Sequence, residues 1–270
     1  MDENIVGSWN IHRYHRGAYK EFEDDIAIEF ALTVVVQGEE YATMICSPCA
    51  LEELVIGFLA SEALIISYED INSIQLDLEA GFAYVELSTD LPNKSYGRTK
   101  RFIGSCCGKS REFYFDQDVK TAKTIMKKHI LSVQEVFSLM DTFQQHSNDF
   151  KRTGGVHQAA IATRHNIQYI AVDIGRHNAL DKVYGYLLKN QISRREKQIV
   201  FSGRISSEVL VKVSKMGIGT LLSPSAPTDL ALRLAEDLNI TTVGFIRQNR
   251  LNVYTGQDYI QEKPSLLDTR

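Results

Sequence analysis

Two adjacent cysteines in a basic segment are the residues of this sequence best suited to chemistry. Cys106 and Cys107 are flanked by Gly104 and Gly108, and five cations lie close to them in the sequence: Arg98, Lys100, Arg101, Lys109 and Arg111. Positive charge stabilises a thiolate, the nucleophilic form of cysteine, and glycine gives the backbone freedom to present it. A disulfide between the two is disfavoured because it would strain the linking peptide. The segment therefore predicts a reactive sulfur on one of these cysteines; the alternative is two small apolar core residues.

The other two cysteines, Cys46 and Cys49, allow a structural and a metal-binding interpretation. Cys46 ends an apolar stretch and fits the role of a small buried side chain. The spacing of Cys46 and Cys49 also suits zinc, so the two could join Cys106 and Cys107 in a four-thiolate site. Adjacent cysteines rarely both face one metal, and we therefore favour a protein without a metal of its own.

Composition and charge restrict the class of protein. The chain has 270 residues, of which 44% are hydrophobic and 24% charged, as in an ordinary globular protein. A net charge of −4 argues against duplex nucleic acid as a main partner, since that would favour a basic face. The N-terminal residues lack the apolar core of a signal peptide, and no apolar run is long enough to span a membrane. We therefore expect a cytoplasmic protein with reduced cysteines and no membrane or nucleic-acid partner.

The hydrophobic pattern predicts an α/β protein with a layered mixed sheet and a smaller α+β N-terminal region. In the first part we expect a hairpin of two strands at 25–36 and 40–46, a helix at 50–64 and two further strands within 71–88. In the second part we expect a helical stretch, 119–144, with a break near Ser132. Strands and helices then alternate: strands at 156–162, 167–172, 199–202, 219–223 and 241–245, and helices at 178–190, 207–216 and 228–238. The predicted regions are 1–110, which ends in the cysteine segment, and 111–270.

Three polar segments, 153–157, 173–182 and 202–208, coincide with predicted junctions between strands and helices or turns. Ligands of open α/β sheets bind outside the carboxyl ends of the strands, and amides at helix starts favour anions. Arg176 and Arg204 would add bidentate phosphate donors, and His157 and His177 lie beside them in the same segments. We therefore predict an anion-binding pocket formed by these four side chains.

Each polar segment also has a simpler structural interpretation. Asn178 and Ser206 could cap their helices. Asp181 and Lys182 could be a solvated ion pair, or they could orient His177, which lies one turn earlier. A strand end at 244–255 combines basic residues with an aromatic ring and could hold a nucleotide, with a solvated sheet edge as the alternative.

Taken together, these segments resemble the FdhD/NarQ family over about residues 29–255. The resemblance rests on the helix that contains Gly57-Phe58-Leu59, on the cysteine segment and on five polar segments of the second half: 154–157, 173–182, 202–208, 223–228 and 244–247. It implies a fold similar to that of cytidine deaminases in the larger part of the chain. It also implies a sulfurtransferase that takes persulfide sulfur from a cysteine desulfurase and passes it to the molybdenum cofactor of formate dehydrogenase.

The resemblance also implies ligands, partners and site residues. The bound substrate would be the bis-molybdopterin guanine dinucleotide form of the molybdenum cofactor. The partners would be a cysteine desulfurase, the catalytic subunit of formate dehydrogenase and a second copy in a homodimer. The family's basic turn carries over to six consecutive residues as cofactor contacts: Phe245, Ile246, Arg247, Gln248, Asn249 and Arg250.

The cysteine segment departs from the family's pattern, in which many members carry Cys-Gly-x-Cys-Gly. If Cys107 and Gly108 match the second Cys-Gly step, Gly104 replaces the first cysteine. If Cys106 matches the first cysteine, Lys109 occupies the second place. Both alignments remain open, and we prefer Cys107 as the persulfide carrier, with Cys106 second, because the Cys-Gly step is kept.

Two other functions compete with sulfur transfer. A zinc-dependent nucleotide deaminase would need His-x-Glu and Pro-Cys-x-x-Cys, and none of the seven histidines is followed by Glu at the second position. A chaperone that binds the cofactor without covalent chemistry would need the polar segments but not the cysteines. A cysteine-free variant distinguishes the chaperone from the sulfurtransferase.

Overall fold

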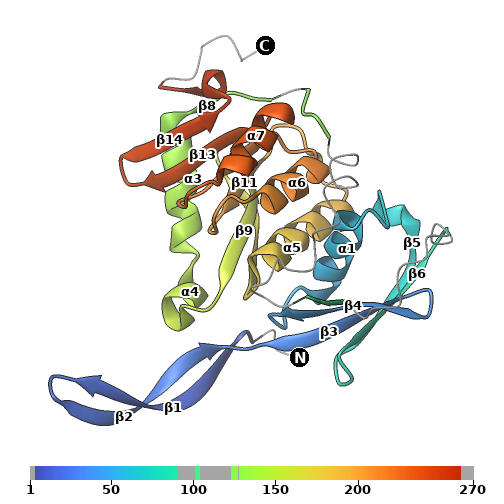
Figure 1. The fold of residues 1–270 in the computed structure, drawn as a ribbon, viewed down its shortest axis with the longest axis vertical. Coiled ribbons are helices and arrows are strands. Elements are labelled where there is room, and N and C mark those ends of the chain that lie inside the picture. Colours follow the sequence, from blue (N-terminus) through green and yellow to red (C-terminus); the bar gives the residue numbers. More distant parts are fainter. Residues whose placement is uncertain (1–3, 90–100, 104–122, 127, 263–270) are drawn as a thin grey trace.

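The fold combines two larger sheets with a separate two-stranded arm (Figure 1). The structure is a computed structural model, which describes residues 4–89, 101–103, 123–126 and 128–262. The α/β class predicted from the sequence is confirmed, whereas the likeness to cytidine deaminases stays a prediction.

The second half of the chain forms a six-stranded mixed sheet in the order β10-β9-β11-β12-β13-β14. Its strands are β9 (His157–Ala162), β10 (Ile167–Asp173), β11 (Gln198–Phe201), β12 (Thr220–Leu222), β13 (Thr241–Arg247) and β14 (Arg250–Thr255). Neighbouring strands of this sheet pair in parallel only among β11, β12 and β13, and the other neighbours are antiparallel. Helix α3 (Val133–Gln145) covers one face, and α5 (Arg176–Lys189), α6 (Ser207–Met216) and α7 (Asp229–Asp237) cover the other (Figure 1).

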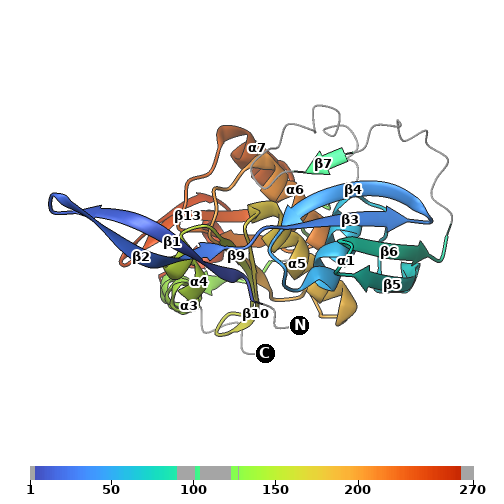
Figure 2. The same ribbon diagram turned by 90° about the horizontal axis from the view of Figure 1, so that it is seen from below.

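The first half forms a five-stranded sheet in the order β5-β6-β3-β4-β7, seen in Figure 2. Its strands are β3 (Phe30–Val36), β4 (Glu39–Cys46), β5 (Ile71–Asp77), β6 (Phe82–Leu87) and β7 (Arg101–Ile103), with the 3₁₀ helix η1 (Tyr68–Asp70) before β5. Helix α1 (Leu51–Ser61) packs between this sheet and α5. One apolar cluster therefore includes side chains from both halves, while the boundary near residue 110 stays a prediction.

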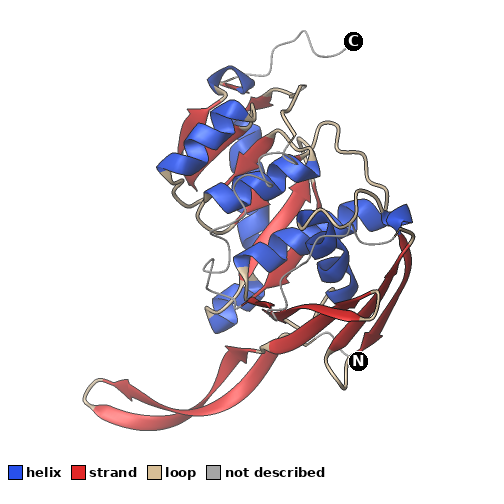
Figure 3. Cartoon of the chain, turned by 45° about the vertical axis from the view of Figure 1, so that its right-hand side comes forward, coloured by secondary structure: helices blue, strands red, loops and turns tan. Residues whose placement is uncertain are grey.

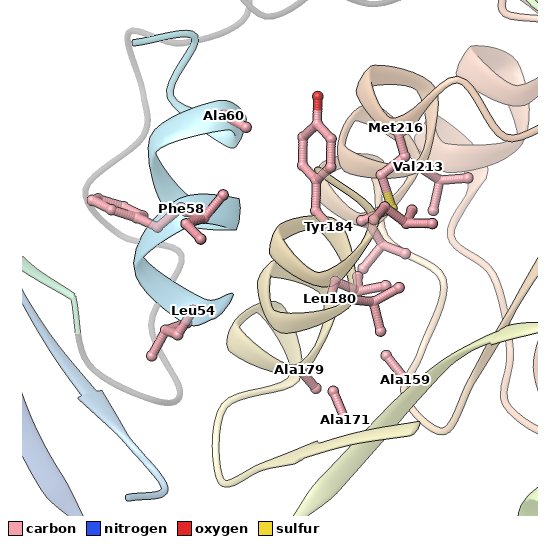
Figure 4. Close-up of a cluster of buried hydrophobic side chains, with 14 of the residues drawn as sticks. Leu54, Phe58, Ala60, Ala159, Ala171, Ala179, Leu180, Tyr184, Val213 and Met216 are labelled. Atoms are coloured by element: carbon pink, nitrogen blue, oxygen red, sulfur yellow. The ribbon is translucent and has the colours of Figure 1, made fainter. Parts of the chain in front are cut away.

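The crossing of α1 and α5 depends on two glycines. A β-carbon on Gly57 would overlap the carbonyl oxygen of Asp181, and one on Gly185 would overlap that of Glu53. The two backbones therefore touch, which only residues without a side chain allow. Around this contact, Leu54 and Phe58 of α1 and Leu180 and Tyr184 of α5 belong to one buried cluster (Figure 4).

The predicted helices and strands of the second half are confirmed in type and order, with one shortened helix. In the helical stretch expected at 119–144, residues 123–126 and 128–130 are not helical, and α3 begins at Val133, directly after the predicted break, where Ser132 caps it in a reciprocal pair with Glu135. The prediction that Asn178 caps a helix is wrong: Gly175 occupies the N-cap position, and Asn178 is buried inside α5. Ser206 does occupy the N-cap position of α6, although its side chain makes no capping hydrogen bond.

Several short or exposed elements were not predicted from the sequence, β7 and β14 among them. The N-terminal arm consists of β1 (Val6–His15) and β2 (Ala18–Ala27), and α4 (Asn148–Thr153) lies against β2. Strands β8 (Leu131–Ser132) and β15 (Ile260–Gln261) form a separate pair after the 3₁₀ helix η2 (Gln257–Tyr259). In the arm, charged and polar residues dominate both strands, so its hydrophobic alternation is weak.

Replacement of Gly57 by alanine is expected to lower the free energy of unfolding by about 1–3 kcal/mol or more, because α1 and α5 must move apart. Gly7→Ala is the control, since a β-carbon there would lie 3.4 Å from its nearest neighbour, Cγ1 of Ile28. Urea unfolding followed by far-ultraviolet circular dichroism measures both variants. Equal stability of the two variants would contradict the close helix crossing.

Candidate functional site

The polar segments predicted from the sequence meet at one edge of the six-stranded sheet. Strands β10, β11, β12 and β13 end there, and the antiparallel β9 begins there, so that His157 pairs with Asp173. We call this region the strand-end site and define it by 154–157, 173–177, 202–208, 223–228 and 244–250. The rule that ligands bind outside the carboxyl ends of strands predicted this arrangement.

Three hydrogen bonds that involve Ser223 or Ser225 join these segments. Oγ of Ser223 donates to the carbonyl of Gly203 at 2.9 Å, and Oγ of Ser225 donates to that of Ser202 at 3.4 Å. The backbone N–H of Phe245 donates to the carbonyl of Ser225 at 3.1 Å. The segments after β11, β12 and β13 are therefore held in one fixed arrangement.

His157, Arg176 and His177 lie close enough to influence one another. Burial lowers the pKa of His157, and the charges of Arg176 and His177 lower it further. Burial also lowers the pKa of His177, although Nε2 of this ring lies 3.0 Å from Oε2 of Glu208, which acts in the opposite direction. Both rings therefore hold a second proton less readily than a free imidazole does, and the Arg176 guanidinium places a positive charge beside them.

Arg204 and the turn between β13 and β14 contribute exposed polar groups to the strand-end site. The side chains of Arg204 and of residues 247–250 are exposed, whereas Phe245 is half-buried. Ile246 is fully buried in the apolar cluster beneath α3, so any contact it makes with a ligand would come from its backbone. Phe245 and Gln248 have φ values of 50° and 45°. Such backbone strain in residues other than glycine is concentrated at functional sites.

A cavity of about 680 Å³ opens beside His157. Its lining includes Phe143 and Phe150 from the α3–α4 region, together with Ser202 and Pro224. The volume falls within the range of ligand pockets, and aromatic rings beside a few polar groups suit a partly apolar ligand. The part of the lining that comes from α4 was not predicted, because α4 has only six residues, too few for a helical periodicity.

A buried ion pair fixes the start of α5. Nζ of Lys182 lies 2.7 Å from Oδ2 of Asp173, and both side chains are completely buried. The Asp173 carboxylate also accepts hydrogen bonds from the backbone N–H groups of Ser47 and Gly175 and from the side chain of Asn178. Burial is the largest single influence and lowers the pKa of Lys182, but the charge and hydrogen bond of Asp173 together with the nearby Cys49 and Cys46 outweigh it, and the net shift is upward. Lys182 therefore keeps its proton and its charge.

The prediction that Asp181 and Lys182 form a solvated pair is wrong, because the two are buried in separate networks. Lys182 pairs with Asp173, while Asp181 pairs with Lys212 of α6 and accepts a hydrogen bond from Ser61 of α1 at 2.6 Å. Their spacing places them on different sides of α5. Neither contacts His177 through a hydrogen bond or ion pair found among the described residues, which leaves their role structural.

The cysteines differ in their surroundings. Burial, aided by Asp173, raises the pKa of Cys46 to about 12, so this thiol stays protonated and acts as a core side chain. Cys49 is half-buried, and its Sγ lies 3.4 Å from Nζ of Lys182. Cys106 and Cys107 lie outside the described residues. The alternative of a zinc site with four thiolates needs both of them and therefore stays a prediction. Within the described parts of the chain, no three His, Cys, Asp or Glu side chains gather in a possible metal site.

The chain entering the cysteine segment is anchored beside β4. The backbone of Ile103, the last described residue before that segment, pairs with Met44, which lies two residues before Cys46.

No helix in the described ranges is long and apolar enough to cross a membrane.

The fold and the strand-end site define an α/β protein with a cluster of basic, hydroxyl and imidazole side chains at one sheet edge. The chain belongs to the FdhD/NarQ family, whose model matches residues 27–261.

Similar proteins support this assignment along nearly the whole chain. A sulfur carrier protein FdhD of Geobacillus kaustophilus is 55% identical over 251 residues, which cover 93% of this chain and 95% of the relative. One of Bacillus subtilis is 48% identical over 264 residues, covering 97% and 100%. A crystal structure described as a formate dehydrogenase accessory protein from Desulfotalea psychrophila superposes with a TM-score of 0.78 at 23% identity, covering 95% of this chain and 100% of that one. The last comparison supports the fold alone.

Lys182→Met is expected to destabilise the protein by about 3–5 kcal/mol, because it leaves the Asp173 carboxylate buried without its countercharge. The matched control is Lys189→Met, also on α5. Lys189 forms 3.0 Å ion pairs with Glu52 and Glu53 but is partly exposed, so its loss should cost less than about 1 kcal/mol. Chemical unfolding gives both values. A Lys182 variant as stable as the Lys189 variant would show that Asp173 does not depend on this countercharge.

Proposed function

We propose that this protein is a sulfur carrier that serves the maturation of formate dehydrogenase. The observation that carries the proposal is the close relationship to proteins named sulfur carrier protein FdhD, at 48–55% identity over at least 93% of this chain. The family match over residues 27–261 agrees with it.

The proposed chemistry is a persulfide exchange on the cysteine segment. A thiolate of Cys107, or of Cys106, attacks the terminal sulfur of a persulfide on a cysteine desulfurase. A new S–S bond forms, the donor's S–S bond breaks, and the donor cysteine leaves as a thiolate. The basic residues near the pair in the sequence would favour the attacking thiolate. The protein acts in this proposal as a sulfurtransferase with the persulfide as its intermediate.

The proposed acceptor of the sulfur is the molybdenum cofactor in its bis-molybdopterin guanine dinucleotide form, bound as a substrate at the strand-end site. Arg176 and Arg204 would hold the phosphates, and His157 and His177 would donate hydrogen bonds as neutral rings. The turn at 245–250 would contact the nucleotide, with the ring of Phe245 against the base. The 680 Å³ cavity beside His157 offers room for part of such a ligand.

The remaining parts of the proposal concern partners and location. The protein would work in the cytoplasm as a homodimer, with a cysteine desulfurase as donor and the formate dehydrogenase catalytic subunit as client. It would need no metal of its own. The competing proposal of a cofactor chaperone shares the strand-end site but assigns no role to the cysteines.

Sulfur loading is expected to depend on the cysteine segment alone. After incubation with a cysteine desulfurase and cysteine, intact-protein mass spectrometry should show a mass gain of one sulfur atom in wild type. Cys107→Ala should lose most of it, and Cys106→Ala part of it, because Cys107 is the preferred carrier. Cys49→Ala is the control, as a half-buried thiol outside the segment.

Loading of a Cys106→Ala/Cys107→Ala double variant to the wild-type level would refute the carrier proposal. If that double variant also supports formate dehydrogenase activity in cells, the chaperone function takes its place.

Guanosine diphosphate, a probe for the nucleotide part of the cofactor, is expected to bind less tightly when the strand-end cations are removed. Arg176→Ala and Arg204→Ala should each weaken binding by roughly tenfold to a hundredfold, since a charged hydrogen bond contributes about 1.5–3 kcal/mol. Isothermal titration calorimetry measures the affinities. Arg195→Ala removes an exposed arginine before the start of β11, whereas the strand-end site follows the end of β11, and should have no effect. Equal affinities in all variants would place the nucleotide elsewhere.

A further inference from the structure

The N-terminal arm projects away from the rest of the molecule in three views (Figures 1, 2 and 3). Strands β1 and β2 pair along ten residues each, so the arm is about 33 Å long. It is attached at its base, where Arg152 of α4 forms a 2.8 Å ion pair with Asp25. A two-stranded hairpin is at best marginally stable in water, and such an arm needs further contacts to persist.

One face of the arm carries four large apolar side chains. The pairing register places Trp9 and Ile11 of β1 on the same face as Phe22 and Ile26 of β2, because side chains alternate along a strand. We call these four residues the apolar arm face. Trp9 is 65% exposed, Phe22 42% and Ile26 40%, which leaves a connected group of large apolar side chains in contact with water. Apolar groups of this kind mark interaction sites.

Charge is separated along the length of the arm. Residues 12–20, at the tip, contain Arg13, Arg16 and Lys20 and no acidic residue. Residues 21–27, toward the base, contain Glu21, Glu23, Asp24 and Asp25 and no basic residue. The arm is therefore basic at its tip and acidic at its base. When a second arm lies antiparallel to the first, the basic tip of each arm meets the acidic base of the other.

We propose that the apolar arm face docks on the same face of a second copy of this chain, with the two arms antiparallel. This surface gives the homodimer of the proposed function a specific contact, although it does not depend on the sulfur chemistry. A two-fold axis produces such a contact between identical patches on both subunits.

The order of side chains on the face fits this arrangement row by row. Ile11 and Phe22 face each other across the two strands and form the central row. The next row toward the tip is Arg13 with Lys20, and the next toward the base is Trp9 with Asp24. With the two-fold axis at the central row, Phe22 meets the partner's Phe22, and Lys20 meets the partner's Asp24. Apolar groups therefore cover one another at the centre, and opposite charges meet on both sides.

Contacts within a single arm show that these groups are chemically compatible. The Arg13 guanidinium lies 5.1 Å from the centre of the Phe22 ring and 2.9 Å from Oδ1 of Asp24. The opposite face differs, because it carries the tilted ring pair of Tyr14 and Tyr19 and the acidic residues Glu21 and Glu23. That face offers no central apolar row, and the pairing of arms is specific to one side.

Sedimentation velocity of the full chain over a concentration series tests the contact. Trp9→Ser and Phe22→Ser are each expected to raise the dimer dissociation constant at least tenfold. Tyr14→Ser is the matched control: Tyr14 is 62% exposed, an aromatic of similar exposure on the opposite face, and should change the constant less than twofold. A wild-type chain that stays monomeric, or a dimer unaffected by Trp9→Ser and Phe22→Ser, overturns the proposal. In the second case the homodimer itself stands and uses another surface.

A charge exchange tests the antiparallel order without disturbing the apolar residues. Lys20→Glu alone places acid against acid at both ends of the paired arms, and Asp24→Lys alone places base against base. Each homodimer should therefore be weakened. An equal mixture of the two variants restores one attractive pair at each end in the mixed dimer and should associate nearly as tightly as wild type. A mixture no tighter than the separate variants overturns the antiparallel pairing.

Discussion

The buried ion pair between Asp173 and Lys182 is the constraint on which the arrangement of this protein depends. It lies where the turn after β4 meets the turn between β10 and α5, so it joins the two halves of the chain. Removing two charges from water is costly, and it is tolerated here because Asp173 and Lys182 each have several further hydrogen-bond partners. The same bonds fix Gly175 and hence the direction in which Arg176 and His177 leave the sheet.

The centre of the molecule combines this polar network with unusually close backbones. Gly57 and Gly185 let α1 and α5 touch, and the second ion pair, Asp181 with Lys212, ties α5 to α6 beside that contact. Ser61 of α1 joins the same network through Asp181. Buried polar groups satisfy one another in only a few arrangements. They therefore select one register of the three helices, which apolar packing alone would leave less well defined.

The geometry of the strand-end site depends on these buried ion pairs and on the contact between α1 and α5. The hydrogen bonds of Ser223 and Ser225 hold its segments together, and the fixed start of α5 positions Arg176 and His177. Arg204 and the turn at 247–250 are exposed to solvent. A rigid base with exposed polar ends suits a large anionic ligand, because little ordering is needed at its phosphates. The base of the N-terminal arm lies beside this site, because a β-carbon on Gly155 would be 3.1 Å from Cβ of Ala27, whereas the rest of the arm projects away from the sheet.

The sequence by itself determined the order of strands β9 to β13 and helices α5 to α7, the strand-end location of the polar segments and the family. These features are local: periodicity predicts strands and helices, and polar residues at strand ends are expected to gather at one edge. Tertiary structure alone decided that Asn178, Asp181 and Lys182 are buried. A polar or charged residue is assigned to the surface unless its partner is known, and the partners of Lys182 and Asp181, which are Asp173 and Lys212, lie 9 and 31 residues away. It also decided that the cavity lining includes residues of α4 and that residues 6–27 form an arm. Those features depend on contacts distant in sequence, or on segments too short or too polar to carry a period.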